Sequence, residues 1–138
     1  MRKLKILVVF LLFGLALYFV FRPSNKKLRA ELNSKNYATT IVNAAYKLGE
    51  RKDKSAIKPL LTHILDPRMS TDINFKGMTV CYCKLAALQK ISNLSPPNEL
   101  NHFAVDTIDV KFYLNWAIRE KFILSENEID LTYNSDRK

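Results

Sequence analysis

Apolar residues recur at helical spacing along most of the chain, and the first clear stretch runs from Tyr37 to Gly49. Its apolar positions follow the i, i+3, i+4, i+7 rule of an amphipathic helix and form one stripe: Ala38, Ile41, Val42, Ala45 and Leu48. Gly49 stands where helices commonly end, because glycine tolerates the left-handed conformation of a C-cap. The pattern therefore predicts an amphipathic helix that ends at Gly49.

A second apolar stripe follows a short basic turn. Its spacing is again helical: Ile57, Leu60, Leu61, Ile64 and Leu65. Asp53 or Ser55 can cap this helix, and Pro59 falls in its first turn, where a missing N–H costs little. The pair Asp66-Pro67 disfavours helical backbone, so the second helix is predicted to end there.

Two more helical regions follow. A looser segment leads into a helix over about 76–92, whose apolar stripe is Met78, Cys81, Leu85, Leu88 and Ile91. The turn "NLSPPN" ends this helix and offers Ser95 or Asn98 as the next cap. Region 100–124 has two apolar rows: Val110, Tyr113, Leu114, Ala117 and Ile118 in one, and Ile108, Phe112 and Trp116 in the other. Such a helix is buried by neighbours on two sides, so Trp116 is predicted to lie in the core.

The N-terminus has a different pattern from the rest of the chain. It is uncharged from Ile6 to Phe21, and this run spans roughly 24 Å as a helix, slightly under a typical hydrocarbon core. Lys5 and Arg22 flank the run and can reach the two interfaces. Residues 1–23 are therefore predicted to be a membrane anchor or uncleaved signal. A cleaved signal is the alternative, although no A-x-A-like cleavage pattern follows the run.

These features predict a single-pass membrane protein, with the membrane contacted through residues 6–21. Basic residues after the apolar run outnumber those before it, which by the positive-inside rule places the body in the cytoplasm. The short basic start also resembles an export signal, and we predict the extracytoplasmic side on that ground. The rest of the chain divides into a basic stalk over 24–36, a helical domain over 37–124 and a polar tail over 125–138, where 129–133 can form a short extended piece.

The net charge of +9 does not form one patch. Residues 1–23 carry +4, residues 24–102 carry +7 and residues 103–138 carry −2. Anionic lipid headgroups explain the basic residues near the apolar run. The aromatic residues expected of a single-strand nucleic-acid groove are missing, so nucleic acid is not the partner we predict. The sequence has only three glycines and no glycine-rich phosphate loop.

Cys81 and Cys83 are the only cysteines in the sequence. Residues two apart on a helix point to different sides, so both are predicted to be small buried apolar residues rather than a disulfide or a ligand pair. His63 lies beside the second stripe as a boundary or surface residue, and His102 follows a turn. Neither histidine has the paired spacing of a zinc site. We predict no catalytic, metal-binding or cofactor-binding residue, and no cofactor.

Two Ala-rich segments, "NAAYKLGERK" and "KLAALQKISN", place Leu48 and Leu88 40 residues apart, a spacing typical of HEAT and armadillo arrays. Residues 43–65 resemble the short HEAT-like repeats at Leu48, Gly49, Asp53, Ala56, Ile57, Pro59, Leu60 and Leu61. The resemblance is weaker over 76–92, where Gln89 stands in place of the glycine. It implies an all-α fold: a short right-handed stack of helical hairpins, a HEAT-like α-solenoid, preceded by one transmembrane helix.

The predicted function is a membrane-tethered adaptor or scaffold that binds an unidentified protein partner and is not an enzyme. Helical repeats present extended surfaces for such partners. The predicted partner-binding edge is basic, and an ordinary solvated face is its alternative: Arg51, Lys52, Lys54 and Lys58. Some short HEAT-like proteins resemble chromophore lyases that attach bilins, so an accessory enzyme stays open. A basic surface that binds nucleic acid or lipid headgroups also stays open.

Overall fold

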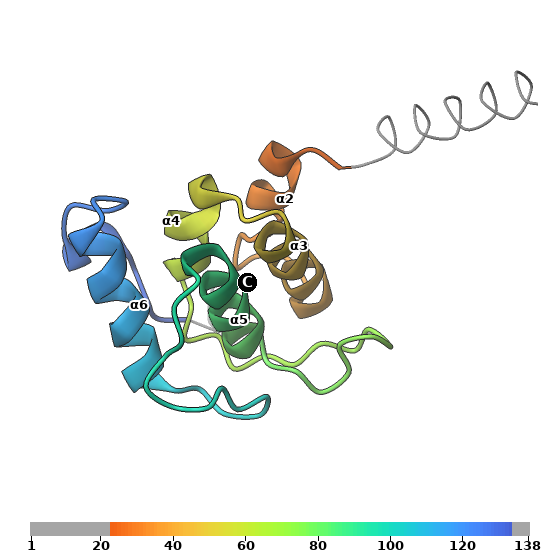
Figure 1. The fold of residues 1–138 in the computed structure, drawn as a ribbon. Coiled ribbons are helices and arrows are strands. Elements are labelled where there is room, and N and C mark those ends of the chain that lie inside the picture. The colour runs from red at the N-terminus through yellow and green to blue at the C-terminus, as the bar shows by residue number, and fades with distance from the viewer. Residues whose placement is uncertain (1–22, 134–138) are drawn as a thin grey trace, which may run out of the picture.

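The computed structural model describes residues 23–133, and within this range the protein is all-helical (Figure 1). It has five α-helices, with two 3₁₀ turns, η1 (Lys54–Ala56) and η2 (Glu126–Glu128), and no β-strand in the described range. The all-α class predicted from the sequence is therefore confirmed. The helices are α2 (Asn25–Glu31), α3 (Ala38–Glu50), α4 (Ile57–Leu61), α5 (Val80–Ser92) and α6 (Thr107–Arg119).

Helices α3 and α5 form the centre of the fold and make its most extensive helix–helix contact (Figure 1). Helix α2 packs on α3, α4 packs on α5, and α6 contacts both α4 and α5. The predicted apolar stripes supply most of the side chains buried between these helices, including Ile41, Val42, Ala45, Leu48, Ile57, Leu60, Leu61, Cys81, Leu85, Leu88, Trp116 and Ala117. Periodicity therefore identified the core correctly over α3, α4 and α5 and over most of α6. The prediction was wrong for Ile108, which is 59% exposed, and it did not include the core residues of α2.

Gly49 is not the cap of α3, as the sequence suggested. The helix continues to Glu50, and Lys52 instead adopts the positive φ of 49° beyond the C-cap. Gly49 is needed for a different reason: a Cβ at this position would lie 2.9 Å from the Cα of Ala87 and 3.1 Å from its Cβ. The missing side chain therefore lets α3 and α5 approach closely, since ordinary carbon–carbon contacts lie at about 3.5–4.0 Å.

Helix α4 is shorter than predicted, because it ends at Leu61 rather than at Asp66. Thr62 is extended, and His63 has a φ of 49°. The next backbone groups bond to the C-terminal segment instead of to a helix: His63 N–H donates to the Asp130 carbonyl at 2.6 Å, and Leu65 N–H to the Leu131 carbonyl at 3.1 Å. These tertiary hydrogen bonds replace the helical ones that the stripe predicted.

The caps of the helices were only partly predicted. Asp53 caps η1 at the start of the second helical region, as expected, by accepting a hydrogen bond from Ser55 N–H. Helix α5 begins four residues later than predicted, where the Thr79 hydroxyl accepts from Tyr82 N–H. Helix α6 is capped by Asp106 and not by the candidates Ser95 or Asn98, so the prediction of its start was wrong.

Residues 24–36, which the sequence assigns to a basic stalk, contain α2. Its Leu28 is buried in the core, and Leu32, its C-cap residue, is buried too. Arg29 pairs with Asp53 at 2.6 Å, so α2 is joined to the residue that caps η1. This segment is therefore part of the packed body.

The predicted single-pass membrane localisation is contradicted by the helices that the structure describes. Over residues 23–133 no helix is long and apolar enough to cross a membrane. The longest helices there have 13 residues, which at about 1.5 Å per residue is well short of the roughly 30 Å of a hydrocarbon core. The predicted anchor over 1–23, with residues 6–21 and the flanks Lys5 and Arg22, lies outside the described residues except for residue 23.

Candidate functional site

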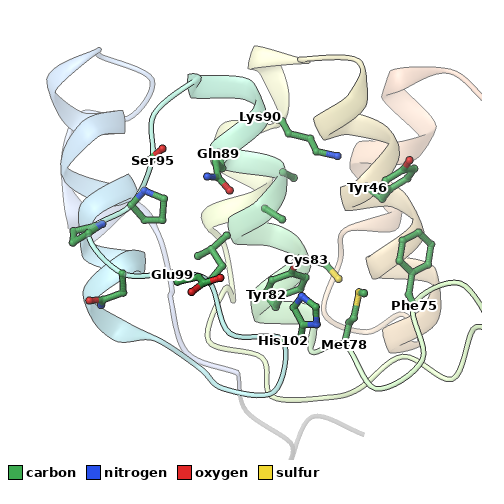
Figure 2. A pocket seen from close by; sticks show the side chains of 16 residues that line it. Tyr46, Phe75, Met78, Tyr82, Cys83, Gln89, Lys90, Ser95, Glu99 and His102 are labelled. Atoms are coloured by element: carbon green, nitrogen blue, oxygen red, sulfur yellow. The ribbon is translucent and has the colours of Figure 1, made fainter.

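A groove of about 710 Å³ runs along α5, between α3 and the connection from α5 to α6 (Figure 2). Helix α5 forms its floor and contributes the short side chains of Cys83, Ala86 and Ala87 together with Tyr82, Gln89 and Lys90. One wall comes from α3 and the segment that precedes α5, and the other from residues 95–102, which connect α5 to α6. We call this feature the α5 groove; its volume lies within the roughly 300–1,000 Å³ range of protein ligand sites.

The first wall of the α5 groove is aromatic. The rings of Tyr46 and Phe75 pack with centroids 5.2 Å apart, and Met78 extends the apolar surface below them (Figure 2). The segment that carries Phe75 is held by backbone hydrogen bonds, from Ser70 N–H to the Met78 carbonyl at 3.0 Å and from Gly77 N–H to the Ser70 carbonyl at 3.1 Å. Gly77 has a φ of 80°, which favours glycine at this turn.

The second wall contains Pro96 and Pro97, whose rings restrict the backbone of the connection. Asn98 attaches this wall to α6 twice, because its N–H donates to Asp109 Oδ1 at 3.3 Å and its side-chain amide donates to Asp106 Oδ2 at 3.2 Å. The Asp109 carboxyl group is fully buried and its other oxygen has no partner within the described residues, so burial raises its pKa. The second wall is therefore fixed to the start of α6 by hydrogen bonds from Asn98, one of which is to a buried carboxyl group.

The lower end of the α5 groove is closed by Tyr82 and His102, whose rings pack edge to face with centroids 4.3 Å apart (Figure 2). His102 is positioned by its backbone, because its carbonyl accepts a hydrogen bond from Thr79 N–H at 3.0 Å. The groove therefore has aromatic rings on one side and at one end. The side chains of α5 between its walls include short ones, so the backbone of a bound segment can approach this helix.

Charges lie only at the edge of the α5 groove. Lys90 pairs with Glu50, and its Nζ atom lies 4.9 Å from the ring centroid of Tyr46. Glu99 is exposed on the opposite wall and has no ion-pair partner within residues 23–133 (Figure 2). The lining of the groove therefore combines apolar and aromatic side chains with polar ones, and one acid on its edge has no ion-pair partner among the described residues.

The cysteine thiols are poor nucleophiles here. Both are buried, as the sequence predicted, and Cys83 contributes to the groove floor. Burial raises the pKa of Cys81 to about 11 and that of Cys83 to about 12, so both stay protonated at neutral pH. Within residues 23–133, no three His, Cys, Asp or Glu side chains gather as a metal site would require.

A buried lysine that the sequence did not single out lies on the core side of α5. Lys84 is 1% exposed, and its ammonium group donates to the Thr62 carbonyl at 2.7 Å, where α4 ends. Burial lowers the pKa of Lys84 to about 8. The sequence did contain a signal for it, because Lys84 stands directly between the apolar residues Cys83 and Leu85. Its contacts indicate a structural role, because they satisfy the carbonyls of Thr62 and His63 directly after α4.

The basic residues predicted to bind a partner do not lie in the α5 groove. Arg51 donates to the Pro23 carbonyl and to Asn25 Oδ1, both at 2.7 Å, and Lys58 pairs with Glu128 at 3.0 Å. Lys52 and Lys54 are exposed. Two of the four side chains therefore hold the fold together and two face the solvent.

The residues of the groove walls were missed for a physical reason: they come from three parts of the chain that only the fold brings together. The available signals were the row Tyr82, Ala86 and Lys90, which has helical spacing opposite the core stripe, and the proline pair in "SPPN". Comparison with known proteins adds nothing to this picture, since no protein family, no curated protein and no solved structure matches the chain.

Proposed function

We propose that this protein is a protein–protein interaction module without catalysis of its own, and that the α5 groove holds a segment of its partner. The observation that carries the proposal is the groove itself: about 710 Å³, lined by aromatic and apolar side chains together with polar ones, with small side chains of α5 on its floor. Grooves of this kind supply binding energy by removing apolar surface from water.

We also propose that the body is a short right-handed stack of HEAT-like helical hairpins. In support, the two Ala-rich helices that lie 40 residues apart in the sequence, α3 and α5, pack side by side. Gly49, near the end of α3, and Ala87, in the middle of α5, form the close contact between them. Stacked equivalent helices are how repeat proteins bury their apolar stripes.

The groove is a better binding site than the basic edge at residues 51–58. Arg51 and Lys58 already bond to other parts of the chain, so a partner would have to displace those contacts. Tyr46 in the groove is exposed to a large degree, and a partner can cover its ring without breaking a hydrogen bond of the described structure. Large aromatic side chains are also the usual anchors of protein interfaces.

The test is photocrosslinking in cells from position 89, where a benzophenone amino acid replaces Gln89 in the groove. The captured protein is then produced separately, and its Kd is measured by calorimetry against the original chain and Ala86→Trp. The tryptophan fills the groove floor, so we expect binding to weaken more than tenfold, about 1.4 kcal/mol or more. The matched control is Lys111→Trp, which adds the same ring at an exposed position of α6 outside the groove. Equal affinity of both variants would contradict the proposal.

A further inference from the structure

We propose that the α5 groove recognises a proline-rich segment in the polyproline II conformation that carries a lysine or arginine. This inference rests on the proposed function of the groove and specifies the chemistry of its partner. Three features of the described residues lead to it: the arrangement of the rings, the unused hydrogen-bond donors and the position of Glu99.

The rings of the groove suit proline side chains. Tyr46 and Phe75 form one aromatic pair and Tyr82 and His102 form another (Figure 2). Ala86 also lines the groove. Proline-rich segments bind in grooves lined by aromatic side chains, and they lose little conformational entropy because the polyproline II helix is already formed in solution. Helix α5 extends about 12 Å from Tyr82 to Lys90, at about 1.5 Å per residue. This length matches about four residues of a polyproline II segment, which rises roughly 3.1 Å per residue.

Hydrogen-bonding groups at the groove distinguish this ligand from a helix. The side chains of Gln89, Ser95 and Tyr82 line the groove, and none of them makes a hydrogen bond within residues 23–133. A polyproline II segment has no internal hydrogen bonds, so its carbonyls need donors such as these. An α-helix satisfies its own backbone and would leave them unused. An added β-strand needs a sheet edge, and the described part of the chain has no sheet.

The charges at the edge select a basic ligand. Lys90 is neutralised by Glu50, whereas the exposed carboxylate of Glu99 has no ion-pair partner within the described residues. A lysine or arginine at one end of the proline-rich segment would pair with Glu99. The net charge of +9 repels a basic peptide at long range, so the attraction has to come from Glu99 at short range.

The experiment is a fluorescence anisotropy titration of the full-length protein with three labelled probe peptides. The first is eight prolines with an arginine at each end, the second has glutamates in place of the arginines, and the third has arginines around four Gly-Ser pairs. We expect the first probe to bind with a Kd in the micromolar range, the second at least threefold more weakly and the third at least tenfold more weakly. Arginines at both ends allow for either orientation of the segment.

Two pairs of variants locate the binding. Ala86→Trp should abolish binding of the first probe, while Lys111→Trp should leave its Kd unchanged. Glu99→Gln should weaken the first probe about threefold, as expected for an exposed ion pair, and should not weaken the glutamate probe. Its control, Glu126→Gln, removes an exposed acid outside the groove and should have no effect.

The outcomes separate this inference from the proposed function. If the proline and Gly-Ser probes bind equally, or if Ala86→Trp leaves the proline probe unaffected, the proline-rich assignment is overturned. A protein crosslinked at position 89 whose binding is lost in Ala86→Trp would still establish the groove as an interaction site, and a helical segment would then be the next ligand to test. If neither the probes nor a crosslinked protein depend on the groove, both proposals fail.

Discussion

The two sides of α5 show how one helix meets two different demands. The core side buries Cys81, Leu85 and Leu88, and its single charged group, Lys84, is bonded to backbone carbonyls at the end of α4. The groove side carries Tyr82 and Gln89, whose side-chain polar groups make no hydrogen bond within residues 23–133. The polar group of the core side is thus bonded within the fold, whereas those of the groove side are left to water or to a ligand, and this difference is one reason why we propose the groove as a site for a partner.

The largest expected effect belongs to the core side. Leu88→Ala should lower the free energy of unfolding by about 3 kcal/mol, because Leu88 is fully buried and its removal leaves a cavity. Urea unfolding followed by circular dichroism measures this. A loss below about 1 kcal/mol would mean that the α3–α5 core is looser than its burial indicates.

Gly49→Ala should lower the free energy of unfolding somewhat less, by about 2 kcal/mol, because the new methyl group would press on the backbone of Ala87. Thermal and urea unfolding report the change. Ala87→Gly removes the methyl group on the other side of the contact, so the double variant should recover part of the loss. Full additivity of the two losses would show that the close approach of α3 and α5 is not what Gly49 permits.

Because burial lowers the pKa of Lys84, we expect the stability of the protein to depend on pH. Its pKa is about 8 when folded and near 10.5 otherwise, so between these values the unfolded state binds more protons and the free energy of unfolding rises with pH. The protein should gain about 1 kcal/mol between pH 8 and 9 relative to Lys84→Met. The measurement is the difference between the two urea curves at each pH.

This difference removes the contribution of the cysteines. Their pKa values are raised by burial, so above pH 9 they make folding less favourable, but they are present in both proteins. Parallel pH profiles for the original chain and Lys84→Met would show that Lys84 keeps its ordinary pKa and is not buried as described.

The smallest effect on stability is expected on the groove side. Ala86→Trp should change the free energy of unfolding by less than about 0.5 kcal/mol, since Ala86 lies at the groove floor and the added ring enters open space. The same variant should nevertheless remove binding at the groove. A large loss of stability would indicate that the groove side of α5 also belongs to the core.

Local sequence patterns predicted the helices well because the physics that forms them is local. The stripe from Ile41 to Leu48 is buried as expected, and Asp53 caps the following turn. Predictions failed where a group found a partner far away in the chain. Helix α4 stops at Leu61 because the backbone after it bonds to residues 130 and 131, and periodicity cannot report such a partner.

The sequence by itself determined that the described part of this protein is helical, which residues form most of its core and that its cysteines are buried, since periodicity and composition carry that information. Only the tertiary structure decided what Gly49 and Lys84 do, because both act through residues more than 20 positions away. It also created the α5 groove, whose walls come from α3, from the segment before α5 and from residues 95–102. A binding surface made of distant segments exists only after the chain has folded, and no local pattern encodes it.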